Sequence, residues 1–205
     1  LQGVTIVNLF FENSTRTRIS FELAQKRLSA DTVNFSASSS SLKKGESFKD
    51  TVQNIMSMKI DAVVMRHPAP GSPKHLSEFI DAVVINAGDG THEHPTQALL
   101  DSFSIFEKIG DLKGKNILIV GDILHSRVAL SNLYLLNLLG ANVKISCPLS
   151  LVPKDIEKLN VSVEPDIQKA LRWCDAVNVL RVQRERMIKS YFPDNREYSI
   201  LFGLD

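Results

Sequence analysis

Residues 4–22 read VTIVNLFFENSTRTRISFE, and this stretch contains the pattern that decides the fold. Its first half is a nearly unbroken run of apolar and β-branched residues, which predicts a buried strand over residues 5–11. The run ends at Phe11, and the amphipathic segment that follows Ser14 predicts a helix over residues 15–28. A buried strand that leads directly into a helix is the repeating unit of a parallel α/β sheet.

The same alternation continues along all 205 residues. Short apolar runs predict strands at residues 5–11, 32–35, 62–65, 82–86, 116–120, 142–146, 161–163 and 176–180. Helical spacing predicts helices at residues 15–28, 47–58, 74–79, 95–109, 126–139, 155–159, 166–174 and 184–191. We therefore predict an α/β fold with two doubly wound parallel-sheet lobes, residues 1–93 and 111–205, joined by a connecting helix at residues 94–110.

Composition narrows the functional class. The chain has 24 Lys and Arg against 23 Asp and Glu, a net charge of +1, which argues against a nucleic-acid-binding surface. No apolar run approaches the roughly 20 residues of a membrane span, and no secretory signal is visible. The only cysteines, Cys147 and Cys174, fit no metal-binding spacing, so we expect a cytoplasmic protein. Because Leu1 and Asp205 lack ordinary start and stop features, we interpret the chain as an internal fragment.

Donor side chains follow the predicted strands at their carboxyl ends, where ligands bind in sheets of this class. Hydroxyl, amide, imidazole and guanidinium donors are all represented. They are Ser14, Thr15, Arg16, Thr17, Arg66, His94, Gln97, Arg127, Arg181 and Gln183. The four arginines among them predict a ligand with several anionic groups.

The segment at residues 14–17 has two interpretations. A helix amino terminus with added hydroxyls and a guanidinium suits a phosphate or carboxylate. The alternative is that Ser14 and its neighbours only cap the helix. The glycines of a Walker A or dinucleotide loop are absent. Arg16 and Arg18 point in different directions on a helix, so we assign Arg16 to the ligand and Arg18 to a nearby carboxylate.

Other segments carry weaker signals. His92 and His94 lie on opposite sides of an extended chain without a third ligand, so no metal site is expected. Pro95 is at a helix N1 position, where a preceding histidine is often structural. Gly121 and Asp122 follow a strand without the spacing of a nucleotide loop. The loop before residue 47 contains Lys44, which either lies in solvent or reaches an anion from a lid.

Taken together, these segments resemble the carbamoyltransferases, and within them the branch that uses aspartate. Seven motifs in order carry the resemblance along nearly the whole chain. They are FFENSTRTR (10–18), KKGES (43–47), MRHP (65–68), NAGDG (86–90), HPTQALLD (94–101), GD with HSRV (121–122 and 125–128) and RVQ (181–183).

The resemblance implies transfer of a carbamoyl group from carbamoyl phosphate to the amino group of L-aspartate, an early step of pyrimidine biosynthesis. The residues implied for the phosphate are Ser14, Thr15, Arg16 and Thr17. Those implied for the carbonyl oxygen are Thr17, Arg66 and His94. Gln97 would reach the carbamoyl amide, and Arg127 and Arg181 would bind the aspartate carboxylates with Gln183 nearby. The residues implied in catalysis are Arg16, Thr17, Lys44, Arg66 and His94.

The family also implies an assembly. Its active sites lie between subunits of a homotrimer, so Lys44 and a serine such as Ser41 would come from a neighbouring subunit. No cofactor is implied, and regulatory chains or a dihydroorotase partner stay open.

Two alternatives remain: a relative that uses L-ornithine, and a non-catalytic subunit with the same fold. Against ornithine, the Ser-Met-Gly segment of the ornithine-using relatives is absent, and Arg181 would repel an ammonium group. The lobes also lack the terminal segments of the family fold.

Overall fold

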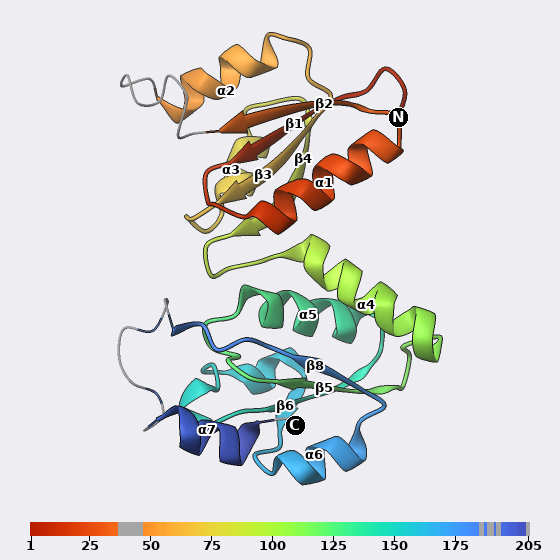
Figure 1. Ribbon diagram of the computed structural model, residues 1–205, viewed down its shortest axis with the longest axis vertical. Coiled ribbons are helices and arrows are strands. Elements are labelled where there is room, and N and C mark those ends of the chain that lie inside the picture. The colour runs from red at the N-terminus through yellow and green to blue at the C-terminus, as the bar shows by residue number, and fades with distance from the viewer. Residues whose placement is uncertain (37–46, 185–186, 188–190, 192–193, 204–205) are drawn as a thin grey trace. The chain divides into compact units, whose positions relative to one another are not determined.

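The computed structural model describes residues 1–36, 47–184, 187, 191 and 194–203. The chain divides into two compact units, Leu1–His94 and Pro95–Asp205. Each contains a four-stranded sheet, and every strand pairing within the two sheets is parallel (Figure 1). The predicted α/β class is confirmed.

The first unit has the strand order β2-β1-β3-β4. Its elements are β1 (Thr5–Phe10), α1 (Thr15–Arg27), β2 (Asp31–Ser36), α2 (Phe48–Met56), β3 (Ala62–His67), α3 (Ser72–Ser77) and β4 (Val83–Asp89). Alternate residues of the central strands point to opposite faces, as the two-residue period of a strand requires. On one face, Val7 and Leu9 of β1 pack with Val52 of α2 and Leu76 of α3. On the other face, Ile6 of β1 belongs to a cluster that includes Phe21 of α1.

One buried position of β1 is polar. Asn8 is fully buried and forms a reciprocal amide pair with Gln25 of α1, with N–O distances of 3.0 and 2.8 Å. Its Nδ2 also donates to Asn34 Oδ1 of β2 at 2.9 Å. Because these bonds satisfy the buried amides, α1 is fixed on the sheet by specific hydrogen bonds as well as by apolar contact.

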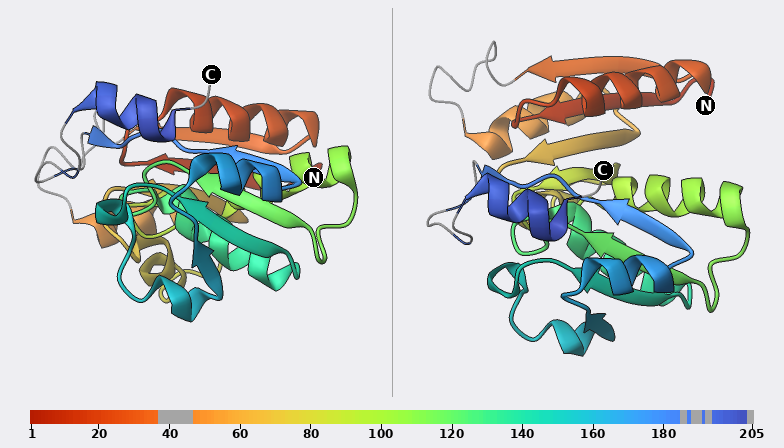
Figure 2. Two further views of the ribbon diagram at one scale, coloured as in Figure 1. Left: turned by 90° about the horizontal axis from the view of Figure 1, so that it is seen from below. Right: turned by 60° about the horizontal axis from the view of Figure 1, so that its bottom comes forward.

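The second unit has the strand order β7-β6-β5-β8. Its helices and strands are α4 (Pro95–Ile109), β5 (Asn116–Val120), α5 (Arg127–Leu138), β6 (Asn142–Ser146), β7 (Val161–Val163), α6 (Ile167–Trp173), β8 (Ala176–Val179) and α7 (Asn195–Phe202). Two 3-10 helices, η3 (Leu149–Leu151) and η4 (Ile156–Leu159), lie between β6 and β7. Figure 2 shows α5 and α6 on opposite faces of this sheet.

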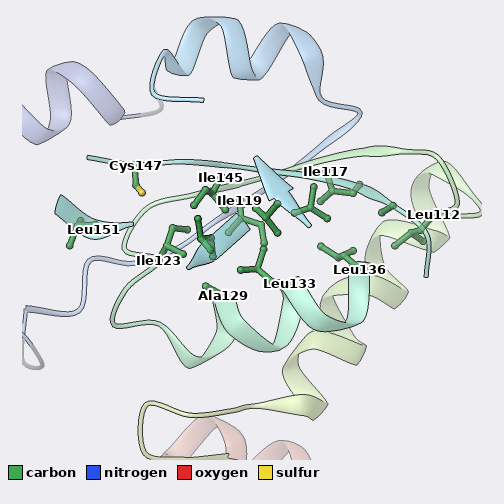
Figure 3. Packing of buried hydrophobic residues seen from close by; sticks show 14 residues of the cluster. Leu112, Ile117, Ile119, Ile123, Ala129, Leu133, Leu136, Ile145, Cys147 and Leu151 are labelled. Carbon is green, nitrogen blue, oxygen red and sulfur yellow. The ribbon is translucent and has the colours of Figure 1, made fainter. Parts of the chain in front are cut away.

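The larger core of the second unit lies between its sheet and α5. Figure 3 shows Ile117 and Ile119 of β5 on the side of the strand that faces Ala129, Leu133 and Leu136 of α5. Ile105 and Ile109 of α4 pack against the same cluster. Residues 94–110, predicted as a separate connecting helix, therefore contribute their helical part, α4, to the second unit.

All eight predicted strands are confirmed, with ends that differ by no more than a few residues. One helix prediction is wrong. Residues 155–159 form only a short 3-10 helix, because Asp155 and Asn160 on either side adopt left-handed conformations. Most of the predicted helix at 184–191 lies outside the described residues, and Met187 and Tyr191 are not helical. Helix α7 was not predicted. Among the described helices, none is both long enough and apolar enough to cross a membrane.

Candidate functional site

In the first unit, the amino terminus of α1 lies beside the carboxyl ends of β1 and β3. The β1–β3 pairing extends past the strand, because the Phe11 backbone N–H donates to the Arg66 carbonyl at 2.9 Å. The chain then turns through Ser14, whose extended backbone precedes the first helical residue, Thr15. This local geometry brings Arg66 to the start of the helix, as the strand-end pattern predicts.

Ser14 differs from an ordinary helix cap. Its side chain caps no backbone N–H; instead the hydroxyl donates to Thr17 Oγ1 at 2.9 Å. By contrast, Ser126 at the start of α5 accepts from the Ala129 N–H at 3.2 Å. The first N–H groups of a helix have no partner within the helix. At α1 the Ser14 hydroxyl does not occupy them, which favours the anion-site interpretation over the capping interpretation.

Arg66 is the buried cation of this region, with 8% of its surface exposed. Its Nη2 pairs with Glu12 Oε1 at 3.1 Å, and its Nη1 donates to the Ala87 carbonyl at 3.2 Å. The same Nη1 is 3.5 Å from Thr17 Oγ1, a long contact. Ser14, Thr17 and Arg66 thus form one continuous set, whereas Thr15 and Arg16 of the same turn are exposed.

The loop after β4 is organised by a buried carboxylate, Asp89. It accepts hydrogen bonds from the Gly71 and Glu93 backbone N–H groups at 2.7 and 3.0 Å, and from Asn86 Nδ2 at 3.0 Å. Burial opposes ionisation of Asp89, but these hydrogen bonds outweigh it and lower the pKa of the carboxyl. The loop leads to His94, whose surface is 7% exposed at the end of the first unit.

His67 follows Arg66 at the end of β3. Its Nδ1 accepts from the Ala69 backbone N–H at 2.9 Å, and its ring lies 5.2 Å from the Phe11 ring, centroid to centroid. Burial lowers the pKa of His67 more than the neighbouring Asp89 and Glu12 raise it. The neutral imidazole is therefore favoured at this position.

In the second unit, β5 and β8 pair directly, so their carboxyl ends are adjacent. Gly121 makes this approach possible, since a Cβ atom there would be 2.5 Å from the Leu180 carbonyl oxygen. The backbone φ of Gly121 is +122°, a conformation that other residues rarely adopt. Arg181 and Gln183 begin immediately after this contact.

Asp122 is fully buried and connects the two loops. Its Oδ1 lies 2.9 Å from His125 Nδ1, and its Oδ2 accepts from the Gln183 backbone N–H at 3.0 Å. Burial, with a smaller contribution from the charge of Asp122, raises the pKa values of Cys147 and Tyr198 to about 12. Both side chains are therefore protonated at neutral pH.

The two arginines predicted for a dicarboxylate follow β5 and β8 in the chain. Arg127 is the first residue of α5 and only 4% exposed. Arg181 is exposed, and its Nη2 donates to Gln183 Oε1 at 3.2 Å. Gln97, on the first turns of α4, donates through Nε2 to Asp101 Oδ1 at 2.7 Å.

Two predicted residues cannot be placed in either unit's site. Lys44 and Ser41 lie outside the described residues. The sequence pattern assigned no role to three acids, Asp89, Asp101 and Asp122, although Asp101 and Asp122 each stand inside a motif that also contains a predicted ligand residue. Within the described part of the chain, no three His, Cys, Asp or Glu side chains come together as metal ligands would.

Comparison with known proteins identifies the fold family. Residues 1–107 match the family profile "Aspartate/ornithine carbamoyltransferase, carbamoyl-P binding domain". An aspartate carbamoyltransferase catalytic subunit of Christiangramia forsetii is 66% identical over 205 residues, which are all of this chain and 66% of that protein. The corresponding subunit of Flavobacterium psychrophilum is 63% identical, again over the whole chain and over 67% of that protein.

Solved structures agree with these matches. The catalytic subunit of M. jannaschii aspartate transcarbamoylase superposes with a TM-score of 0.83 at 38% identity, covering 98% of this chain and 67% of that one. The Trypanosoma cruzi aspartate transcarbamoylase in complex with carbamoyl phosphate and aspartate gives a TM-score of 0.83 at 33% identity, covering 92% and 63%. The chain thus spans about two thirds of the length of its relatives.

Proposed function

This chain belongs to the aspartate/ornithine carbamoyltransferase family, and we propose that it transfers the carbamoyl group of carbamoyl phosphate to L-aspartate. The products would be N-carbamoyl-L-aspartate and phosphate, in an early step of pyrimidine biosynthesis. The observation that carries the proposal is the set of Ser14, Thr17 and Arg66 at a helix amino terminus whose serine does not cap the helix.

Carbamoyl phosphate would bind to the first unit. The phosphate would accept from the backbone N–H groups at the start of α1 and from Ser14 and Thr17, with Arg16 as the exposed cation that closes over it. Arg66 and His94 would donate to the carbonyl oxygen together with Thr17. Arg66 suits this role because its guanidinium is held in place by Glu12 and the Ala87 carbonyl.

L-Aspartate would bind to the second unit through its two carboxylates. Arg127 and Arg181 supply the two guanidinium groups, and the hydrogen bond from Arg181 to Gln183 limits where that exposed side chain points. Two cations after neighbouring strands suit a dicarboxylate and would repel the ammonium group of ornithine. This charge pattern favours aspartate over ornithine as the acceptor.

The chemistry needs no nucleophilic side chain. The neutral aspartate amine attacks the carbamoyl carbon, the bond from this carbon to the phosphate oxygen breaks, and the departing phosphate takes the proton that the amine loses. Negative charge grows on the carbonyl oxygen during the attack, and each fixed donor there typically lowers the barrier by about 2.7–4 kcal/mol. Orientation of the two substrates supplies much of the remaining acceleration.

The assembly completes the proposal. We expect a cytoplasmic homotrimer in which Lys44 and Ser41 of a neighbouring subunit reach the phosphate, as the family resemblance implies. Association with regulatory chains or with a dihydroorotase is compatible with this arrangement.

A measurement of carbamoyl phosphate binding distinguishes the two interpretations of Ser14, as part of an anion site or as a helix cap. Ser14→Ala in the full-length protein should weaken binding of carbamoyl phosphate by about tenfold, measured by calorimetry, with little loss of stability. Asp166→Ala is the matched control, because Asp166 accepts from the Lys169 N–H at 3.1 Å as an ordinary cap of α6. It should lower the free energy of unfolding by about 1 kcal/mol and leave binding unchanged. The reverse pattern would make Ser14 a cap only.

A further inference from the structure

Asp101 receives three amide side chains from three elements of the second unit. Its Oδ1 accepts from Gln97 Nε2 at 2.7 Å, and its Oδ2 accepts from Asn132 Nδ2 of α5 at 2.8 Å and Asn178 Nδ2 of β8 at 3.1 Å. A carboxylate only accepts hydrogen bonds, so each amide must turn its nitrogen toward Asp101.

Gln97 and Asp101 are four residues apart, and their hydrogen bond by itself could be an ordinary pair on a helix surface. The hydrogen bonds to the second carboxylate oxygen, Asp101 Oδ2, show that this pair is different. Asn132 is 1% exposed and its Nδ2 also donates to the Val128 carbonyl at 3.0 Å. Its Oδ1 is buried without a hydrogen-bond partner among the described residues. The unit therefore tolerates an unsatisfied acceptor while the Asn132 nitrogen stays turned toward Asp101.

We propose that Asp101 is a positioning residue for substrate specificity, which fixes the Gln97 amide so that its Oε1 faces the carbamoyl NH₂ group. This inference rests on the proposed function and on the role that the family resemblance implies for Gln97, which is to reach the carbamoyl amide. Because one N–H of Gln97 Nε2 is donated to Asp101, Oε1 lies at the opposite end of the amide, where it can accept from a ligand. An acceptor selects a donor such as NH₂ over a group of similar size that cannot donate, such as CH₃.

The variant Asp101→Asn makes a specific prediction. Asn132 and Asn178 both need an acceptor, so the oxygen of the new amide should stay on their side and its NH₂ group should face Gln97. Gln97 would then rotate to accept, and would present its own NH₂ to the substrate. Two donors would face each other with carbamoyl phosphate, but not with acetyl phosphate, which has CH₃ at that position.

The test compares kcat/KM for carbamoyl phosphate and acetyl phosphate, with L-aspartate as acceptor, in the full-length enzyme. Asp101→Asn should reduce the value for carbamoyl phosphate by about tenfold and that for acetyl phosphate by less than threefold. Gln97→Ala should lose the same preference, and Asp101→Asn should cause no further loss of preference in that background. Ile105→Val, on the same helix and packed against the core, should lower stability and leave the preference unchanged.

Two results would overturn the inference. An equal fall for both substrates would make Asp101 purely structural, and so would a further loss of preference when Asp101→Asn is added to Gln97→Ala. The wild-type enzyme distinguishes failure of the proposed function from failure of the inference about Asp101. If it does not turn over carbamoyl phosphate with aspartate, the proposed function fails and this inference fails with it; if only the variants deviate, the proposed function stands.

Discussion

At the scale of single residues, Gly121 has the most restrictive environment in the candidate site. An alanine there would combine an unfavourable φ with a 2.5 Å contact between its Cβ and the Leu180 carbonyl oxygen. Gly121→Ala should lower the free energy of unfolding by about 3 kcal/mol or more, measured in urea, and should reduce activity by displacing Arg181. The control is Gly114→Ala, where φ is +73° but no atom lies within 4 Å of the added Cβ. It should cost about 1–2 kcal/mol. Equal losses would contradict the steric argument.

His67 should make stability depend on pH. Its pKa in the folded protein is below the ordinary value of 6.5, so the unfolded chain takes up a proton first as the pH falls. The contribution of His67 is fully present above pH 6.5 and is lost as the pH falls toward the folded pKa, by at most about 1.4 kcal/mol per pH unit. Urea unfolding of His67→Gln between pH 5 and 8 should show a flatter profile.

The sequence predicted these residues unevenly. Arg66, Arg127 and Arg181 were found because cations after strands are conspicuous in a linear pattern. Asp101 and Asp122, which connect loops and helices of the second unit, were assigned no role. Their contacts with Asn178 and Gln183 join residues far apart in the chain. Local spacing carries no information about such contacts.

At the scale of elements, the Asn8–Gln25 amide pair predicts a coupling between β1 and α1. Asn8→Ala would leave the buried Gln25 amide short of its two bonds to Asn8, at a cost of about 1–3 kcal/mol in unfolding free energy. Gln25→Ala should cost a similar amount, and the double variant should cost clearly less than the sum, measured by urea unfolding. Simple additivity would mean that the two amides act independently.

The elements themselves were largely predictable. Strands buried on both faces leave apolar runs that local pattern detects, which is why β5 was found with its observed bounds. The failures involve short segments. Residues 155–159 have helical spacing, but left-handed residues at both ends restrict them to η4. Helix α7 offers only eight residues, a length at which periodicity is a weak signal.

At the scale of the whole molecule, we propose that the first unit binds the phosphate of carbamoyl phosphate and that the second binds the carboxylates of aspartate. The first unit offers a helix amino terminus and a buried guanidinium for carbamoyl phosphate, and the second offers two arginines for the carboxylates of aspartate. Family membership supports both assignments, and this chain matches about two thirds of the length of those relatives.

The most direct test follows product formation by the full-length protein from carbamoyl phosphate with L-aspartate and, in parallel, with L-ornithine. We predict turnover with aspartate alone, and a loss of that turnover of at least a hundredfold in Arg66→Ala, since this change removes a donor to the developing oxyanion. Turnover with ornithine would contradict the assignment of Arg127 and Arg181 to a dicarboxylate. Absence of turnover with either amino acid would contradict the proposed activity itself.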